Sequence, residues 1–241
     1  MRLVHQIWMQ GWKYAPFELL DRMQTSEKHW GEHTQVMKWD EQGIIQLLES
    51  SFPSYVQWYM SIHNLIIRCD VARAFILHEF GGLYADCDYD PSLLHNAAWK
   101  SDSSVVWAGH DKLLGGNNAW MLALQPKMPF WLDIYIPYVQ TNLREPSLKD
   151  IAGNIFLNTW SVLSTTGPFA IARLADRYPR HLRLIPYETV FKQWGIHMSK
   201  EPTWYTWRTL RLQRLCVCIL LSFAFIGLVC IAKYPLLALL R

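Results

Sequence analysis

The sequence predicts an α/β fold in which helices flank a sheet, followed by one transmembrane helix near the C-terminus. Short apolar segments of strand length alternate with helical patterns in the N-terminal part of the chain. The 241 residues suffice for one domain with a well-buried core. An uncharged run of 18 residues, Leu215 to Ala232, would span about 27 Å as a helix, which matches the hydrocarbon thickness of a bilayer.

The N-terminal elements are expected to follow one another as strand, helix, strand and helix. An apolar segment from Leu3 to Trp8 predicts a buried strand, and a helical pattern begins at Pro16 and runs toward Lys28. Thr34 to Trp39 predicts a second strand. Asp40 then offers an N-cap for a helix that carries apolar residues through Leu48. This order favours a parallel sheet with helices packed against it.

The longest helical pattern before the apolar run extends from Ile62 to Phe80. Apolar side chains recur along it three or four residues apart, which predicts one buried stripe made of Leu65, Ile66, Cys69, Ala72, Phe75, Ile76 and Phe80. Gly81 and Gly82 end this helix and let the chain reverse into a strand that starts at Leu83.

The later elements alternate in the same way. Ser104 to Ala108 predicts another strand, and Gly115 to Asn118 is typical of a polar turn. A helix with an aromatic face is expected from Pro129 to Leu143, and an amphipathic helix from Phe169 to Arg177. His181 to Ile185 alternates as a late strand.

Three acids, Asp86, Asp88 and Asp90, occupy alternate positions at the end of the strand that starts at Leu83. In an extended segment such residues share one face, so Asp86 and Asp88 would lie roughly 7 Å apart. Carboxylates held that close repel each other unless a cation lies between them. Oxygen ligands suit Mg²⁺ or Mn²⁺, with substrate phosphate completing the shell. A solvated polar loop is the alternative for these acids.

Three charged residues, Arg68, Asp70 and Arg73, lie beside the apolar stripe of the long helix. Asp70 and Arg73 are three residues apart, so they are close enough on a helix to pair. Position alone leaves two interpretations open, a surface ion pair and a clamp for a substrate.

Charge and cysteine content exclude some classes of function. Residues 1–214 carry 21 basic and 20 acidic residues, because Lys233 and Arg241 account for two of the 23 basic residues. A nearly neutral domain gives no argument for nucleic-acid binding. Cys69 and Cys87, the two cysteines outside the apolar run, show no metal or redox spacing.

Basic and aromatic residues at both ends of the apolar run predict a membrane anchor. Arg208, Arg211 and Arg214 precede the run, and Lys233 and Tyr234 follow it. The excess of basic residues before the run places the N-terminal domain on the cytoplasmic side. The lumen of the Golgi or endoplasmic reticulum is the alternative.

Several motifs together resemble the sugar-binding region of DXD-containing glycosyltransferases. They are His-Gln-Ile-Trp at 5–8, Arg-x-Asp-x-x-Arg at 68–73 and Gly-Gly-Leu-Tyr-Ala-Asp-x-Asp at 81–88. The sequence is most similar to glycosyltransferase family thirty-two, which contains yeast initiating α-1,6-mannosyltransferases and mannosyl-inositol-phosphoceramide synthases. Ser164-Thr165-Thr166-Gly167-Pro168 resembles the Ser-Thr-Gly-Pro motif of the latter, with one extra threonine. His197 and Trp204 resemble a late histidine and tryptophan of that family, although Pro202 and Thr203 depart from its pattern.

The resemblance implies a GT-A fold with a single Rossmann-like mixed sheet, a nucleotide-sugar donor, Mn²⁺ or Mg²⁺, and retention of anomeric configuration. It implies that Asp86, Asp88 and Arg73 are catalytic, and that Asp88 ligates the metal. It also implies that Asp86 contacts the ribose and sugar or reaches the metal through water, and that His197 completes the metal shell or touches phosphate. The donor-binding residues that it implies are His5, Gln6, Trp8, Arg68, Asp70, Arg73, Tyr84, Asp86, Asn117 and Asn118, with Trp8 stacking on the base.

The sequence therefore predicts a catalytic domain over residues 1–207 and a basic segment with a single-pass anchor over residues 208–241. The expected reaction moves a hexose, foremost mannose from GDP-mannose, to a lipid-linked or glycan acceptor such as inositol phosphoceramide. One alternative is a galactosyl- or N-acetylglucosaminyl-transferase that uses a UDP-sugar. Another is an inactive, tail-anchored binding protein. Donor turnover that requires Mn²⁺ and is lost in Asp88→Asn would exclude this alternative.

Overall fold

The structure, a computed structural model, describes residues 2–30, 33–87, 102–111, 114–143 and 155–185. In these ranges no helix has the length and apolar character needed to span a bilayer. The predicted span at 215–232 and the predicted domain boundary near residue 208 lie outside the described residues, so both stay predictions.

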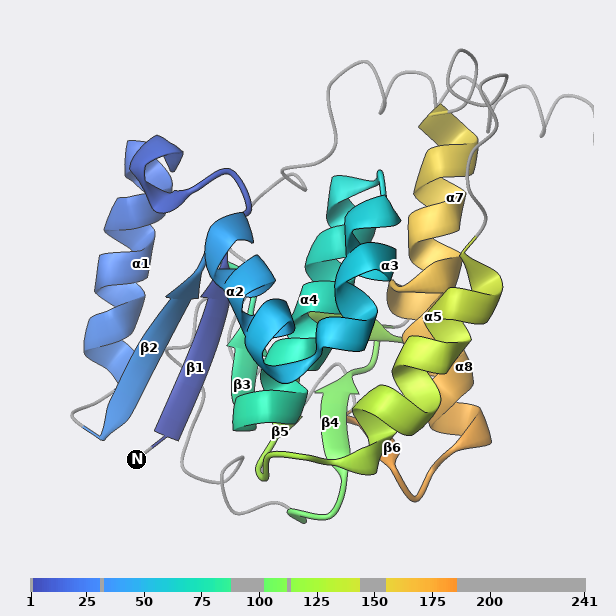
Figure 1. Cartoon of the computed structure of the whole chain (residues 1–241). Helices are drawn as coiled ribbons and strands as arrows, with labels where there is room; N and C mark the ends of the chain where they lie inside the picture. Colours follow the sequence, from blue (N-terminus) through green and yellow to red (C-terminus); the bar gives the residue numbers. More distant parts are fainter. Residues whose placement is uncertain (1, 31–32, 88–101, 112–113, 144–154, 186–241) are drawn as a thin grey trace, which may run out of the picture. The chain divides into compact units, whose positions relative to one another are not determined.

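Six strands form one mixed sheet in the order β2-β1-β3-β5-β4-β6 (Figure 1). Their bounds are β1 (Arg2–Ile7), β2 (Thr34–Trp39), β3 (Gly82–Ala85), β4 (Val106–Gly109), β5 (Asn117–Ala123) and β6 (Leu182–Ile185). β1 pairs in parallel with β2 and β3, and β4 with β6, whereas β5 is antiparallel to both β3 and β4. The mixed sheet is confirmed. Five strands, β2, β1, β3, β4 and β6, therefore run in the same direction. Their C-terminal ends lie at one edge of the sheet, called here the carboxyl edge.

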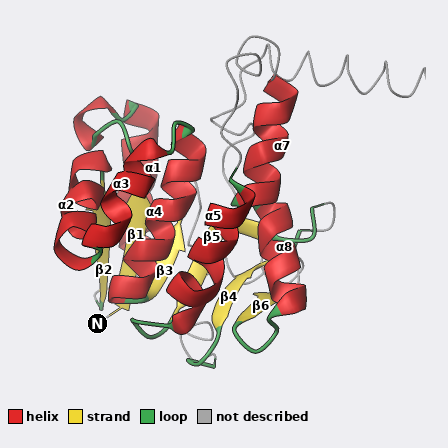
Figure 2. Cartoon of the chain, turned by 45° about the vertical axis from the view of Figure 1, so that its right-hand side comes forward, coloured by secondary structure: helices red, strands yellow, loops and turns green. Residues whose placement is uncertain are grey.

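The helices α2, α3, α4 and α5 cover one face of the sheet, as Figures 1 and 2 show. The bounds of the helical elements are η1 (Trp12–Tyr14), α1 (Phe17–Trp30), α2 (Glu41–Ser51), η2 (Pro53–Tyr55), α3 (Val56–Ser61), α4 (Leu65–Phe80), the π-helical η5 (Phe130–Tyr135), α5 (Ile136–Asn142), α7 (Ile155–Thr165) and α8 (Pro168–Arg177). The sequence reasoning did not predict α7.

Local capping explains where the helices begin. The Asp40 side chain accepts a hydrogen bond from the backbone N–H of Gly43 at 2.9 Å, which confirms it as the N-cap of α2. Asn64 caps α4 by accepting from the N–H groups of Ile66 and Ile67. Ile62 therefore precedes the helix, and α4 begins three residues later than predicted.

Alternating side chains of the strands form two hydrophobic clusters on opposite faces of the sheet. The larger cluster joins the helices to strand residues such as Ile7, Tyr84 and Met121. The smaller one contains Val4, Leu83, Ala85, Trp120, Leu122 and Ile185. The face that carries Tyr84 is thus the face beneath the helices.

The predicted stripe on α4 is wrong at its ends. Leu65 and Phe80 are exposed, whereas the middle of the helix is buried on every side, Asp70 and Arg73 included. The reason is that α4 packs both on the sheet and against neighbouring helices. A helix in that position buries charged side chains together with apolar ones, which periodicity alone does not reveal.

The double glycine after α4 is required by close packing of β3 on β1. Gly82 has a φ of 91°, and a Cβ on it would lie 2.6 Å from the carbonyl oxygen of Leu3. Because any larger residue would push β3 away from β1, glycine at this position allows the strand that leads to Asp86 to pair centrally in the sheet.

His5 is buried between β2 and the start of β3. Its Nδ1 accepts a hydrogen bond from Trp39 Nε1 at 3.2 Å, so its Nε2 carries the proton and donates to Gly81 O at 2.9 Å. Burial lowers the pKa of His5 to about 4, and the hydrogen bond to Gly81 opposes this only in part. The folded protein therefore holds His5 neutral.

Acid should destabilise the fold through His5. Between its ordinary pKa of about 6.5 and its folded pKa of about 4, the unfolded chain binds a proton that the folded chain rejects. Stability is thus full above pH 6.5 and falls as the pH drops toward 4. Urea unfolding should lose about 2 kcal/mol between pH 7 and pH 5, and the loss should shrink in His5→Gln. Equal pH dependence of the two proteins would contradict this assignment.

Candidate active site

Asp86 lies directly after β3, at the carboxyl edge of the sheet. Its backbone N–H donates to Ala119 O at 2.7 Å, which continues the pairing of β3 with β5 by one residue. The Tyr84 hydroxyl donates to Asp86 Oδ1 at 2.6 Å. The Asp86 side chain keeps 33% of its surface exposed. This carboxylate is therefore oriented by the protein and still accessible to a ligand.

Arg73 reaches from α4 toward the same carboxylate. Its guanidinium stacks over the Tyr84 ring at 4.1 Å and lies 3.7 Å from Asp86 Oδ1. It also donates to the backbone carbonyl of Asn118 on β5. Nε of Arg73 is buried and has no hydrogen-bond partner among the described residues. A cation thus lies beside Asp86 with donor capacity to spare.

Asp70 pairs with the same guanidinium nitrogen of Arg73, Nη2, that faces Asp86. The two form an ion pair of 2.6 Å with side-chain exposures of 6% and 3%, so the pair is buried and the surface interpretation is wrong. Asp70 Oδ2 accepts a hydrogen bond from Thr166 Oγ1 at 2.5 Å. Asn118 Nδ2 in turn donates to Thr166 O at 3.3 Å. Elements far apart in sequence therefore meet at one buried carboxylate.

The electrostatics of the cluster keep Arg73 charged. Burial alone would lower the pKa of Arg73, but attraction by the carboxylates of Asp70 and Asp86 raises it well above its ordinary value. Burial raises the pKa of Tyr84 well above its ordinary value, so Tyr84 remains a neutral donor to Asp86. One buried cation between two carboxylates leaves the cluster with a net charge of −1, which suits a cation beside Asp86.

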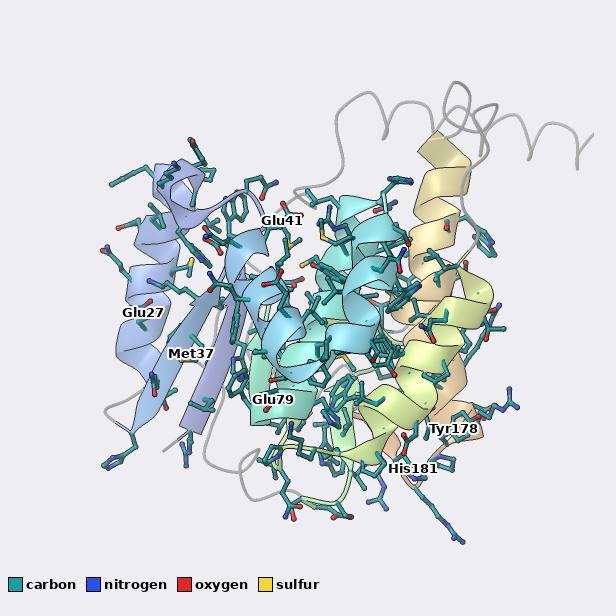
Figure 3. All side chains as sticks on the ribbon, in the orientation of Figure 1. Glu27, Met37, Glu41, Glu79, Tyr178 and His181 are labelled. Atoms are coloured by element: carbon teal, nitrogen blue, oxygen red, sulfur yellow. The ribbon has the colours of Figure 1, made fainter. Side chains whose placement is uncertain are left out.

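Arg68 makes its contacts elsewhere. It pairs with Glu41 at the start of α2 and lies 5.3 Å from the Tyr59 ring of α3. Figure 3 shows Glu41 and Glu79 at opposite ends of the helical layer, and α2 begins where β2 ends. Arg68 thus lies toward the carboxyl edge without a contact to the cluster formed by Asp70, Arg73, Tyr84 and Asp86.

The N-terminal candidates lie on and just after β1. His5 uses both ring nitrogens within the protein, and Gln6 is buried with 2% exposure. Trp8 follows the end of β1 at the carboxyl edge, and its buried Nε1 has no partner among the described residues. The donor-binding roles of all three stay predictions.

The polar turn predicted at residues 115–118 extends too far, because β5 already begins at Asn117. Asn117 and Asn118 are the first residues of β5. Asn117 Oδ1 accepts from the backbone N–H of Ala119 at 2.8 Å, a local contact, whereas Asn118 binds Thr166 and Arg73. The structure thus joins Asn118 to the cluster. Sequence reasoning missed Thr166 as part of it, although the motif at 164–168 was the signal.

The metal ligands can be tested only in part. Asp88 and His197 lie outside the described residues. The described ranges contain no group of three or more histidine, cysteine or acidic side chains that could hold a metal. Asp86 supplies an accessible carboxylate, the ligand type that Mn²⁺ and Mg²⁺ prefer. The described residues therefore fit a divalent cation at Asp86 and leave its remaining ligands to prediction.

Comparison with known proteins identifies similar sequences and one solved structure. The chain is 22% identical over 191 residues to inositol phosphoceramide mannosyltransferase 2 of Schizosaccharomyces pombe, covering 75% of this chain and 48% of that protein. It is 24% identical over 148 residues to mannosyl phosphorylinositol ceramide synthase CSH1 of Saccharomyces cerevisiae, covering 59% and 34%. The solved structure of PaToxG glycosyltransferase aligns with a TM-score of 0.45 and 15% identity, covering 74% of this chain and 69% of that one.

The chain spans about half or less of the length of these two curated relatives. Residues 18–103 match the family described as the glycosyltransferase sugar-binding region containing DXD motif. This range includes Asp70, Arg73, Tyr84 and Asp86, the four side chains that meet at the carboxyl edge. Residues 18–103 are therefore similar to the sugar-binding region of DXD-containing glycosyltransferases, and the cluster lies within this range.

Proposed function

We propose that the protein is a metal-dependent, retaining glycosyltransferase that moves mannose from GDP-mannose to a lipid-linked acceptor of the inositol phosphoceramide type. One observation carries the proposal: an accessible, oriented carboxylate follows the central strand β3, with a buried arginine 3.7 Å away. A carboxylate that serves a cation and an arginine that serves phosphate or hydroxyl groups are what a nucleotide-sugar site needs.

The choice of sugar and acceptor is supported by the relatives. The two curated proteins described above are named as enzymes of inositol phosphoceramide mannosylation. Their similarity covers only part of each protein, so mannose, GDP and the ceramide acceptor belong to the proposal. A UDP-sugar donor remains an outcome of the donor test below.

The chemistry follows from the charges. Breaking the bond between the sugar C1 and the donor phosphate leaves a diphosphate with additional negative charge. A divalent cation bound at Asp86, with Asp88 as the proposed second ligand, would neutralise that leaving group, a contribution of several kcal/mol. Arg73 holds its positive charge beside Asp86 and is fixed by Asp70, so it needs no reorganisation as the charge develops.

Retention is proposed to proceed on one face of the sugar. No described carboxylate is assigned as a nucleophile on the opposite face. In the proposed step the acceptor oxygen forms its bond to C1 on the side from which the phosphate oxygen departs. The acceptor proton passes to that phosphate oxygen, so the protein need supply only binding and orientation.

The membrane anchor at 215–232 is proposed to hold the site near lipid-borne acceptors, which raises their effective concentration. The basic residues Arg208, Arg211 and Arg214 would attract anionic headgroups. Protein without residues 208–241 should keep activity on a soluble acceptor and lose it on liposomal acceptor; undiminished liposomal activity would refute the tether. Protease protection would decide between the proposed cytoplasmic orientation and the lumenal one.

A donor panel tests the proposed function. Purified protein in detergent is incubated with GDP-mannose, UDP-galactose or UDP-N-acetylglucosamine, with Mn²⁺, Mg²⁺ or chelator, and nucleoside diphosphate release is measured. GDP release from GDP-mannose that requires a divalent cation is expected. Release from a UDP-sugar alone would replace the proposed donor, and no release from any donor would favour an inactive binding protein.

A further inference from the structure

The turn between α7 and α8 is built to bury one threonine side chain. The N–H groups of Thr166 and Gly167 both donate to Val162 O, at 3.1 and 2.8 Å, which closes the end of α7 tightly. A Cβ on Gly167 would lie 3.0 Å from Val162 O, so a larger residue would require the turn to shift by a few tenths of an ångström. Pro168 then starts α8. Thr166 has no exposed surface as a result.

Side chains from three other elements, β5, η5 and α5, donate hydrogen bonds to the carbonyl groups of this turn. Asn118 of β5 and Tyr135 of η5 both donate to Thr166 O, at 3.3 and 3.4 Å. Tyr138 of α5 donates to Ser164 O at 3.1 Å. These contacts to carbonyl oxygens therefore fix the backbone of Thr166 relative to β5, η5 and α5, independently of its hydroxyl group.

The Thr166 hydroxyl binds the carboxylate that holds Arg73. Its Oγ1 donates to Asp70 Oδ2 at 2.5 Å, while Asp70 Oδ1 lies 2.6 Å from the Arg73 guanidinium. Asp70 is thus held at both oxygens, and its position sets that of Arg73, 3.7 Å from Asp86. Without the hydroxyl, a buried carboxylate oxygen would lose a partner, which favours rotation of Asp70 and displacement of Arg73.

We propose that Thr166 is a positioning residue for glycosyl transfer, which acts by locking Asp70 so that Arg73 faces the donor beside Asp86. The inference rests on the proposed function. It also aligns residues 164–168 with the Ser-Thr-Gly-Pro motif: Thr166 corresponds to the threonine of that motif, and Thr165 is the extra residue.

Four variants test this inference in the purified full chain. Thr166→Val keeps the shape and removes the hydroxyl, Thr166→Ser keeps the hydroxyl, and Thr166→Ala is smaller than both. Thr165→Val is the matched control, because it makes the same substitution at a neighbouring buried threonine. Nucleoside diphosphate release is measured at varied donor and at varied acceptor, and circular dichroism reports the folded fraction.

Thr166→Val should lower kcat/KM for the donor by about 30-fold or more, because small misplacement of a positioned group costs up to about 100-fold. Its KM for the acceptor should stay within about twofold, and Thr166→Ser and Thr165→Val within about threefold of the wild type. If Thr166→Val does not fold, the same contrast is expected between Thr166→Ala and Thr166→Ser.

A loss that is equal for valine and serine, or that affects donor and acceptor alike, would reduce Thr166 to a packing residue and overturn the inference. So would retention of kcat/KM within about threefold in Thr166→Val. In all of these outcomes the wild type still turns over the donor. If the proposed function itself is wrong, the wild type turns over no donor, and the inference fails with it.

Discussion

Replacing Asp86 with asparagine is expected to lower kcat at least about 100-fold, because several kcal/mol of leaving-group stabilisation depend on its negative charge and each 1.36 kcal/mol is tenfold in rate. Asparagine has nearly the same shape and can still accept the Tyr84 hydroxyl. The fold should therefore persist, with circular dichroism and thermal unfolding close to those of the wild type. Nucleoside diphosphate release with saturating donor and Mn²⁺ measures the effect.

Asp176→Asn is the control, since it makes the same chemical change at an exposed position on α8. Its kcat should equal that of the wild type within error. If Asp86→Asn also kept wild-type kcat, the carboxylate after β3 would have no part in the reaction, and the site proposed around it would be wrong.

Removing the charge of Arg73 is expected to have the largest effect on stability. Arg73→Met leaves the carboxylate of Asp70 buried, with 2% exposure and without its ion-pair partner. Breaking a buried pair in this way costs about 3 to 5 kcal/mol. Urea unfolding in detergent should show that loss, and Arg73→Met combined with Asp70→Asn should regain part of it because no unpaired charge remains.

Lys127→Met provides the comparison, because Lys127 pairs with Glu79 at the surface, with side-chain exposures of 57% and 21%. An exposed pair contributes about 1 kcal/mol or less. A loss for Arg73→Met as small as that for Lys127→Met would show that the Asp70 carboxylate finds water or another partner, and that the buried cluster is not rigid.

The parts of the site that the sequence predicted depend on local geometry. Asp70 and Arg73 pair because residues three apart meet on any helix. The glycine pair at 81–82 predicted the end of α4 and the strand toward Asp86, because glycine permits the positive φ that the turn requires. Asp40 was recognised as an N-cap for the same reason: the contact it makes lies within three residues.

The parts that could not be predicted depend on contacts between distant segments. Thr166 is 96 residues from Asp70 in sequence, and only the packing of α7 and α8 near α4 brings their side chains together. The reversed direction of β5 follows from how the chain returns to the sheet, which the apolar pattern of a strand does not encode. Burial of the Asp70–Arg73 pair likewise reflects neighbouring helices rather than the α4 sequence.

The central claim is that the carboxylates after β3 hold a cation against the diphosphate of a nucleotide. Crystals grown or soaked with MnCl₂ and GDP, with data collected near the manganese absorption edge, test it most directly. The claim predicts an anomalous peak about 2.2 Å from a carboxylate oxygen of Asp86 or Asp88, with the GDP diphosphate on the side of the peak nearest Arg73. Bound GDP with no anomalous peak at either carboxylate, or GDP bound away from Arg73, would contradict it.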